Sequence, residues 1–447
     1  MGRSAKSVSA PTALDQLAKR IANRSARIGV IGLGYVGLPL GIEFAKEGFR
    51  VTGIDLDRRR VDGVNNAKSY IEDVPNEDLK RLRAVKRLSA TTSFDALAQQ
   101  DAIIICVPTP LRKTREPDMS YIISATHEIA KRFKKGQLIV LESTTYPGTT
   151  EEVILPALQE KGLKVGVDFC LAFSPERIDP GNPTFQTRNI PKVIGGVTRR
   201  CTLLTSALYS SAIQRMVPVS SSKTAEMVKL LENTFRAVNI GLVNEMALIC
   251  DRLGINVWEV INAAKTKPFG FMPFYPGPGI GGHCIPSDPV YLAWKVRVHG
   301  FEARFIELAT QINGFMPEYV VQRVTRALND RRKALKGARV LLLGLAYKKD
   351  IGDMRDSPAY DVAKILKERE AVISYHDPYV ATASLNGKRL SSVPLTVKTL
   401  KACDCVVLLT NHSNVDYGLV ARHAPVIMDT RNQYDRVAGH AGRVVTL

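Results

Sequence analysis

The chain has 447 residues, enough for two or three domains of roughly 150 residues each, which excludes a peptide or a disulfide knot. Hydrophobic residues make up 45% of it and charged residues 23%, a composition too apolar for intrinsic disorder. The net charge of +19 favours polyanionic partners: nucleic acid, an anionic membrane or phosphorylated small molecules.

Composition and spacing also exclude several classes of site. We find neither an RNP-type motif nor zinc-finger spacing, so no nucleic-acid partner is predicted, and charge of this kind is often a solvated face. The 7 cysteines are odd in number and form no CxxC pair, so we predict neither a disulfide framework nor a metal site. No apolar run reaches the ~18 residues of a membrane helix, and no signal peptide is recognised. We therefore expect a cytoplasmic protein without membrane insertion.

In chain order, the first α/β pattern follows a short N-terminal tail. Residues 1–25 are interpreted as a basic tail that leads into a surface helix with Leu14, Leu17 and Ile21 on one face. From Ala26 the pattern is strand, Gly-rich turn, helix and strand. Further apolar runs, 102–107 and 138–141, follow segments of helical period. Strands that alternate with helices predict a parallel doubly wound sheet.

A helical region separates this pattern from a second one. Between about residues 220 and 335 the strand-like runs disappear, and apolar residues from Ala225 to Ile249 recur at steps of three and four, which predicts a long helix. A Pro/Gly-rich stretch around 267–289 interrupts this region and is expected to be an ordered loop. From Ala338 the strand-helix pattern resumes. We predict two Rossmann-like doubly wound domains joined by a central helical domain, with boundaries at 1–25, 26–218, 219–335 and 336–447.

Gly32-Leu33-Gly34-Tyr35-Val36-Gly37 lies between an apolar strand and a helix, the context in which a GxGxxG motif predicts a dinucleotide site. Asp55, at the end of the next strand, is placed to accept hydrogen bonds from the ribose hydroxyls. Its charge would repel a 2′-phosphate, which favours NAD, although Arg58, Arg59 and Arg60 leave NADP as an alternative. The second α/β domain lacks GxGxxG, so we do not expect the same dinucleotide there.

Three further patterns have both a chemical and a structural interpretation. Cys284, in a Gly-rich loop, is either a nucleophile or a buried apolar cysteine. Lys229 and Asn233, four residues apart on one helix face, either hold the oxygen of a reacting carbonyl or lie on a solvated surface. Thr144 and Glu176 follow strand-like runs, where ligands bind in open α/β sheets, but either residue also suits a cap or a turn.

With these residues collected, the chain closely resembles the nucleotide-sugar 6-dehydrogenase family. The resemblance covers about residues 26–435 and rests on VIGLGYVGLPL, Val107 to Pro110, ESTTYPGTTEE, SPERIDPGN, NTFRAVNIGLVNE, GPGIGGHCIPSDP and GLAYKKDIGDMRDSP. The segment KPFGFMPFYPGPGIGGHCIP is most similar to the UDP-N-acetylglucosamine 6-dehydrogenase branch, which serves bacterial surface polysaccharide. The resemblance implies an oxidoreductase that uses NAD to convert the C6 alcohol of a UDP-sugar to a carboxylate.

The resemblance also implies roles. Cys284 would form a thiohemiacetal and then a thioester, Lys229 and Asn233 would stabilise the oxyanion, Asp288 would assist acid/base steps, and Thr144 and Glu176 would position water. The implied cofactor-binding residues are Gly32, Gly34, Tyr35, Val36, Gly37, Asp55, Pro108, Thr109 and Thr144. The implied substrate-binding residues are Glu176, Arg177, Lys229, Asn233, Phe274, Tyr275, Gly277, Gly281, Lys348 and Arg355. The long helix matches the family's dimerisation element, which implies a homodimer or a larger even assembly.

Two departures bear on the substrate. Pro180 and Ser287 stand where the UDP-glucose form of the family has a second glutamate and often a lysine, which favours an N-acetylated sugar. UDP-N-acetylmannosamine, UDP-N-acetylgalactosamine and UDP-glucose remain alternative substrates. Two other classes of protein remain as alternatives: a two-electron β-hydroxyacid dehydrogenase, which needs neither Cys284 nor the second α/β domain, and a basic, NAD-binding regulator of polysaccharide assembly.

Overall fold

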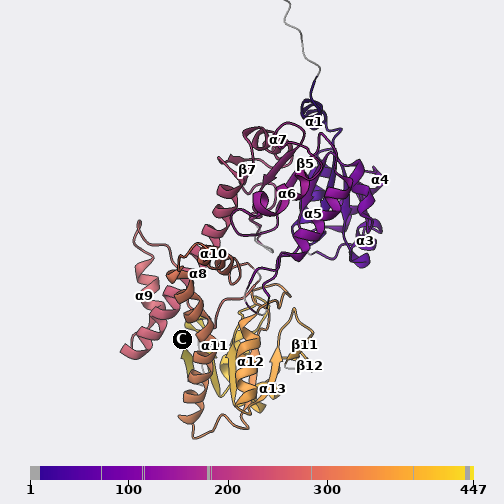
Figure 1. The fold of residues 1–447 in the computed structure, drawn as a ribbon. Coiled ribbons are helices and arrows are strands. Elements are labelled where there is room, and N and C mark those ends of the chain that lie inside the picture. Colours follow the sequence, from indigo (N-terminus) through magenta and orange to yellow (C-terminus); the bar gives the residue numbers. More distant parts are fainter. Residues whose placement is uncertain are drawn as a thin grey trace, which may run out of the picture. The chain divides into compact units, whose positions relative to one another are not determined.

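The protein is described by a computed structural model for residues 11–71, 73–112, 114, 116–178, 182, 184–282, 284–385, 387–437 and 443–447. It forms two compact units, Met1–Leu231 and Glu232–Leu447, and the division falls inside the long helix α8 (Ser222–Leu253). Each unit has its own sheet and its own core (Figure 1). Pro180 and residues 1–10 of the predicted tail lie outside the described residues.

The first unit is built on a sheet with the order β3-β2-β1-β4-β5-β6-β7-β8 in the described chain. Its strands are β1 (Arg27–Ile31), β2 (Arg50–Ile54), β3 (Leu88–Thr91), β4 (Ala102–Ile105), β5 (Leu138–Leu141), β6 (Cys170–Phe173), β7 (Lys192–Gly196) and β8 (Met216–Pro218). The first six follow the doubly wound order 3-2-1-4-5-6 and pair in parallel, which confirms the predicted fold class. Among the described strand pairs of this sheet, only β6 and β7 run antiparallel.

Helices cover both faces of this sheet. They are α1 (Ala13–Ala22), α2 (Gly37–Lys46), α3 (Arg58–Asn65), α4 (Asn76–Ala84), η1 (Phe94–Gln99), α5 (Ser120–Arg132), η2 (Thr150–Ile154), α6 (Leu155–Gln159) and α7 (Arg199–Tyr209). The β4 sequence AIII is buried at every position, as expected of a central parallel strand. Leu14, Leu17 and Ile21 of α1 are buried in the same cluster as β1, so this helix belongs to the core of the unit.

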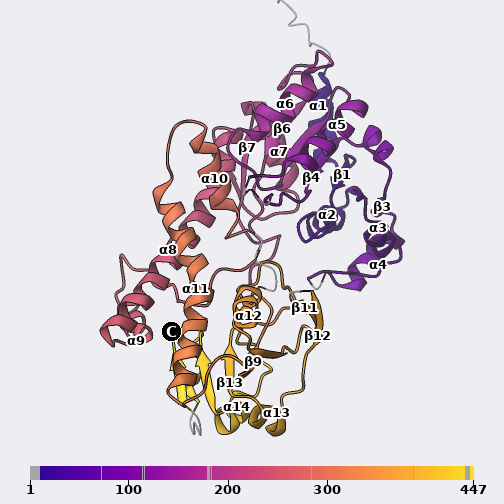
Figure 2. The same cartoon turned by 60° about the horizontal axis from the view of Figure 1, so that its bottom comes forward.

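The second unit begins with helices, as the apolar periodicity predicts. After α8 come α9 (Val257–Ala264), α10 (Asp288–Arg297) and α11 (Arg304–Asn329), and no strand is described between β8 and β9. The connection from α9 to α10 is an irregular segment. Figure 2 shows α11 alongside α12 (Pro358–Glu368), and α11 also contacts α10 and two strands of the second sheet.

The second sheet has the described order β10-β9-β13-β14-β15, all in parallel. Its strands are β9 (Arg339–Leu343), β10 (Val372–His376), β13 (Cys405–Leu408), β14 (Val426–Asp429) and β15 (Arg443–Thr446). The remaining elements are the hairpin β11 (Thr382–Leu385) and β12 (Lys388–Ser391), the helices α13 (Val397–Ala402) and α14 (Tyr417–His423), and η3 (Tyr434–Arg436). The order 2-1-3-4-5 is again doubly wound.

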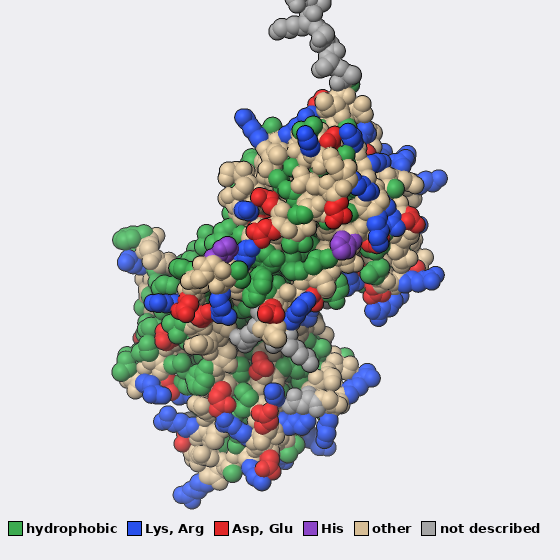
Figure 3. Space-filling view, in the orientation of Figure 1, with side chains coloured by type: hydrophobic (Ala, Val, Ile, Leu, Met, Phe, Trp, Pro, Cys, Tyr) green, Lys and Arg blue, Asp and Glu red, His purple; other side chains and the backbone are tan. Residues whose placement is uncertain are grey.

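The excess of positive charge is not gathered in one place on the visible face. Lys and Arg side chains are scattered over both units with Asp and Glu between them (Figure 3). In the described part of the chain, no helix is long and apolar enough to cross a membrane.

Candidate active site

The Gly-rich turn between β1 and α2 has the geometry of a phosphate-binding loop. Gly32 has φ +92°, and a Cβ there would lie 2.5 Å from the carbonyl oxygen of Cys106. A Cβ on Gly37 would lie 1.9 Å from the Gly32 carbonyl oxygen, so only glycine permits this approach of helix to strand. Among the described residues other than Gly34 and its two chain neighbours, no atom lies within 4 Å of the position a Gly34 Cβ would take, and no described side chain caps the start of α2. The turn therefore leaves room for a pyrophosphate at the helix N-terminus.

Asp55 lies at the carboxyl end of β2 and is joined to this turn. Its carboxylate accepts the Leu33 N–H at 2.8 Å and the Asp57 N–H at 2.9 Å, and it pairs with Arg60 at 3.2 Å. The neighbouring Arg59 pairs with Asp57 at 2.8 Å. Asp55 is thus fixed at the turn, as expected of the residue that binds the adenosine ribose.

The other predicted cofactor residues follow neighbouring strands. Pro108 and Thr109 come after β4, and Thr144 comes after β5, so they lie at the same carboxyl edge as the Gly-rich turn. Tyr35 of the turn and Pro108 are exposed, Val36 and Thr144 are half-buried, and Thr109 is buried. Ligands of open α/β sheets bind at this edge, where the strand order reverses. The residues present fit a dinucleotide.

A second cluster of predicted residues lies after β6 in the same unit. Lys229 on α8 donates a hydrogen bond to the Glu176 carbonyl oxygen at 2.6 Å. The Glu176 carboxylate accepts the N–H groups of Arg177 and Ile178, each at 2.6 Å. The Arg177 guanidinium donates to the Pro191 carbonyl oxygen at 2.7 Å. The structure therefore brings Glu176 and Lys229 together as neighbours.

Two charged residues that the sequence analysis did not select, Lys192 and Glu142, form a buried network with Glu176. Lys192, the first residue of β7, donates to Glu142 at 2.7 Å and to Glu176 at 3.2 Å. Burial raises the pKa of Glu142 to about 7, despite the charge of Lys192. Glu142 directly follows β5, and Thr144 lies two residues further on. The position of Glu142 after a strand could therefore have identified it as a candidate site residue. Lys192 gave no comparable signal, because it lies at the start of an otherwise apolar strand.

In the second unit, the loop before α10 carries the predicted nucleophile. Cys284 is exposed, and its carbonyl oxygen accepts the N–H of Asp288 at 2.8 Å, which closes the turn that starts the helix. The Asp288 carboxylate accepts a short hydrogen bond from the Asn233 side-chain amide on α8. Thus two predicted catalytic residues, Asn233 and Asp288, are in direct contact, and Cys284 is one helical turn away along the chain.

The Gly-rich loop also contacts the segment between β9 and α12 that carries the predicted substrate cations. The Gly282 N–H donates to the Arg355 carbonyl oxygen at 3.2 Å, and a Cβ on Gly281 would lie 2.6 Å from the Tyr347 Cβ. Lys348 follows Tyr347 and is half-buried. A Cβ on Gly277 would lie 2.8 Å from a guanidinium nitrogen of Arg431, a residue after β14 that the sequence analysis did not select.

The two predicted aromatic residues extend this loop toward α8 and α9. Phe274 meets Phe235 of α8 edge-on at 5.7 Å between ring centroids. Tyr275 stacks on Trp258 of α9 at 6.1 Å. They attach the start of the loop to the helices rather than to the second sheet.

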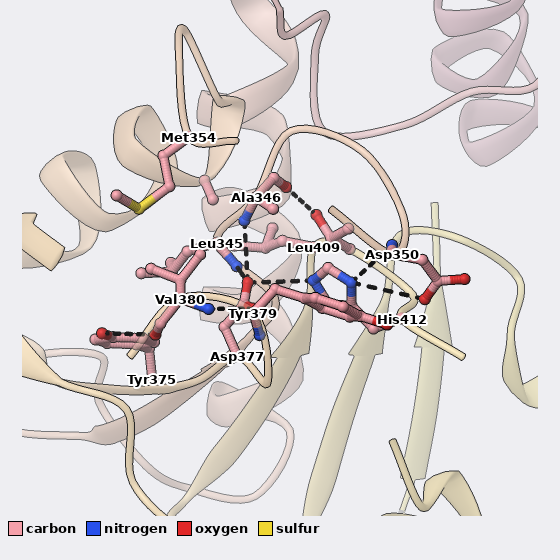
Figure 4. A network of polar contacts seen from close by, with 12 residues as sticks. Leu345, Ala346, Asp350, Met354, Tyr375, Asp377, Tyr379, Val380, Leu409 and His412 are labelled. Atoms are coloured by element: carbon pink, nitrogen blue, oxygen red, sulfur yellow. Dashed lines mark hydrogen bonds and ion pairs between the residues drawn. The ribbon is translucent and has the colours of Figure 1, made fainter. Parts of the chain in front are cut away.

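A buried network holds the segment that carries Lys348 (Figure 4). Asp377, at the end of β10, accepts the N–H groups of Leu345 and Ala346 at 2.7 and 3.1 Å. His412 contacts Asp377 through Nε2 at 3.2 Å, and its Nδ1 accepts the N–H of Asp350 at 3.0 Å. Both ends of the segment 345–350 are therefore fixed by buried side chains.

Comparison with known proteins identifies the family of this chain. Three models of the UDP-glucose/GDP-mannose dehydrogenase family match: the NAD binding domain at residues 26–213, the central domain at 223–314 and the UDP binding domain at 341–436. The chain is 36% identical over 392 residues to UDP-N-acetyl-D-glucosamine 6-dehydrogenase of Pseudomonas aeruginosa, covering 87% of this chain and 91% of the relative.

A second relative has a solved structure. UDP-N-acetyl-D-mannosamine dehydrogenase of Pyrococcus horikoshii is 36% identical over 413 residues, 91% of this chain and 95% of that protein. A structure of this enzyme from P. horikoshii aligns with a TM-score of 0.85 at 34% identity over 94% of this chain and 99% of the other. The chain belongs to the UDP-glucose/GDP-mannose dehydrogenase family, and it is an NAD-dependent oxidoreductase of nucleotide sugars.

Proposed function

We propose that this enzyme oxidises the C6 hydroxyl of UDP-N-acetylglucosamine to the carboxylate of UDP-N-acetylglucosaminuronate in two successive two-electron steps, for bacterial surface polysaccharide. NAD, when bound, supplies the hydride acceptor for each step. The division into an NAD-binding domain (26–218), a central helical domain (219–335) and a UDP-sugar-binding domain (336–447) is part of this proposal.

The chain's own residues would carry the remaining chemistry. The Cys284 sulfur attacks the C6 aldehyde to give a thiohemiacetal, and loss of a hydride from that carbon leaves a thioester. Lys229 and the Asn233 amide donate hydrogen bonds to the oxygen that gains charge. Asp288 holds or releases the proton at that oxygen. Thr144 and Glu176 orient the water that hydrolyses the thioester.

The observation that carries the proposal is the surroundings of the Cys284 loop. The loop glycines contact three residues of the second unit: Gly277 contacts Arg431, Gly281 contacts Tyr347, and Gly282 contacts Tyr347 and Arg355. Tyr347 directly precedes Lys348, and Arg355 follows it in the same segment. Cations in this region suit the diphosphate of a sugar nucleotide. An exposed thiol on the same loop suits covalent attack on the attached sugar, a requirement of four-electron oxidation that a two-electron dehydrogenase lacks.

UDP-N-acetylmannosamine is the second candidate substrate. One relative named for N-acetylglucosamine and one named for N-acetylmannosamine are each 36% identical to this chain. The two sugars differ only in the configuration at C2, which the shape of the sugar pocket selects. Ser287, in place of a lysine, favours an N-acetylated sugar over glucose.

The test is NADH formation with UDP-N-acetylglucosamine, UDP-N-acetylmannosamine, UDP-N-acetylgalactosamine and UDP-glucose, with NADH counted per sugar consumed. Two NADH per UDP-N-acetylglucosamine would support both the route and the substrate. Two NADH from another sugar would keep the route and change the substrate. One NADH per sugar would contradict the thioester route.

We further propose that the enzyme is a homodimer or a larger even assembly that forms through α8. Phe235, Leu242 and Ile249 are 45%, 53% and 43% exposed and recur every seven residues, so they form an apolar stripe. A second copy of α8 would cover it. Light scattering should give an even multiple of the chain mass, and Leu242→Asp should shift it toward the monomer; a monomeric wild-type enzyme would contradict the proposal.

A further inference from the structure

Within the first unit, a chain of buried polar groups extends from Glu176 to α7. Lys192 is 5% exposed and bridges Glu142, which is 0% exposed, and Glu176, which is 13% exposed. On the far side, the Tyr209 hydroxyl of α7 donates to the second Glu142 oxygen at 2.6 Å. Each Glu142 oxygen thus has one partner, and Lys192 is held between two carboxylates that come from the ends of neighbouring strands.

The two carboxylates that share Lys192 are in different electrostatic states. Burial opposes ionisation of Glu176, but the charge of Lys192 and the N–H groups of Arg177 and Ile178 lower its pKa below the ordinary value. Burial raises the pKa of Glu142 to about 7. Besides Lys192, the titratable groups that interact with these two carboxylates are Cys106 after β4, Tyr209 of α7 and Lys229 of α8.

A buried ion pair is rarely there for stability alone. Desolvation of the ions costs about as much as their attraction returns, and apolar residues of similar volume are often equally stable. Here Lys192 donates to the carboxylate of Glu176, the residue whose backbone carbonyl oxygen accepts a hydrogen bond from Lys229. The arrangement therefore fits a role in the chemistry of Glu176.

We propose that Lys192, held by Glu142 and Tyr209, is a positioning residue that keeps the Glu176 carboxylate ionised and fixed for thioester hydrolysis. This inference rests on the proposed function. In that step a water oxygen bonds to the thioester carbon, the carbon–sulfur bond breaks, and the electron pair leaves with the Cys284 sulfur. Glu176 accepts the proton that the water loses. No redox partner is needed, because both oxidations have already taken place.

The experiment is rapid mixing of full-length Lys192→Met enzyme with excess NAD and the UDP-sugar that the wild-type enzyme oxidises. We expect a burst of about two NADH per active site, followed by turnover roughly 10- to 100-fold slower than wild type, because a positioned base contributes about 10²- to 10⁴-fold. The sugar adduct on Cys284 should accumulate and be visible by intact-protein mass spectrometry. The pH at which hydrolysis is half-maximal should rise, since burial alone disfavours the Glu176 carboxylate.

Lys46→Met is the matched control. Lys46, at the end of α2, also bridges two carboxylates, Glu43 and Asp78, each at 2.9 Å, but neither belongs to the proposed site. Its burst and turnover should match wild type. Glu142→Gln is the second, isosteric variant, usable if Lys192→Met does not fold. It should slow hydrolysis several-fold in the same way and leave the burst in place.

Three results have distinct meanings. Burst and steady rate that fall in proportion in both variants, with no adduct on Cys284, would overturn the inference and leave Lys192 a structural residue. Unchanged hydrolysis in both variants would overturn it as well. Wild-type enzyme that makes no NADH from any UDP-sugar would instead refute the proposed function, and the inference with it.

Discussion

Glu226, on the first turns of α8, should make the stability of the first unit depend on pH. Its carboxylate is buried and accepts the N–H of Gly148 at 2.6 Å, and the N–H and hydroxyl of Thr150 at 2.9 and 2.6 Å. It thereby satisfies the N-terminal donors of the helix that begins with η2. Burial, only partly offset by these bonds, raises its pKa from 4.5 to about 7.

The sign follows from proton binding. The folded chain keeps the Glu226 proton up to about pH 7, whereas the unfolded chain releases it near pH 4.5, so the folded state binds more protons between these values. The free energy of unfolding therefore falls as the pH rises through this window. Each pKa unit corresponds to about 1.4 kcal/mol, which gives at most about 3 kcal/mol over the window and about 2 kcal/mol between pH 5.5 and pH 8.5.

Glu226→Gln removes this titration and leaves at least one buried donor without its acceptor, a loss of about 1–3 kcal/mol. We expect it to destabilise the protein by about 2 kcal/mol more at pH 5.5 than at pH 8.5. Urea and thermal unfolding of both proteins at both pH values test this, because Glu142 titrates in both and cancels in the difference. Glu160→Gln, at an exposed glutamate after α6, controls for the lost charge. An equal effect at both pH values would refute the reasoning.

Three further predictions concern the candidate site. Gly37→Ala places a Cβ 1.9 Å from the Gly32 carbonyl oxygen, so NAD affinity measured by calorimetry should fall at least about tenfold while circular dichroism stays native; unchanged affinity would argue against the loop. Cys284→Ala should abolish acid production and leave NAD binding intact, and acid formed at the wild-type rate would exclude the covalent route. His412→Asn releases one end of the Lys348 segment and should raise KM for the UDP-sugar several-fold with KM for NAD unchanged; a fall in kcat alone would contradict this role.

The dinucleotide loop could be predicted because its determinants are local. Gly32, Gly37 and Asp55 are separated by one strand and one helix, and the strand-turn-helix pattern fixes their arrangement. The positions of Thr144 and Glu176 could also be predicted from the sequence, since residues that follow parallel strands lie at one edge of the sheet. Periodicity identified these strands without any knowledge of tertiary contacts.

The charged network behind Glu176 could not be predicted in this way. Lys192 and Glu142 are 50 positions apart in the chain and meet only because β5, β6 and β7 are neighbours in the sheet. The antiparallel pairing of β6 with β7 was unexpected too, because no motif marks the reversal. Arg431 approaches Gly277 from a strand more than a hundred residues later. Contacts of this range depend on the packing of whole elements.

The two sheets use the same turn after their first strand. Gly344 follows β9 with φ +86°, as Gly32 follows β1 with φ +92°. A Cβ at Gly344 would lie 2.4 Å from the Thr410 carbonyl oxygen, the same kind of close approach to the next strand over. In each unit an aspartate directly follows the next strand along the chain, Asp55 after β2 and Asp377 after β10.

The two aspartates differ in how much of their hydrogen-bonding capacity the protein itself uses. A carboxylate offers about four lone-pair positions. Asp377 is 2% exposed and already has five donors, the N–H groups of Leu345, Ala346, Tyr379 and Val380 together with His412. It has no capacity left for a ribose hydroxyl, so all of its hydrogen bonds are made within the second unit. In the proposed function, the cations of the segment that Asp377 holds would bind the ligand instead, and cations suit a diphosphate rather than an adenosine ribose.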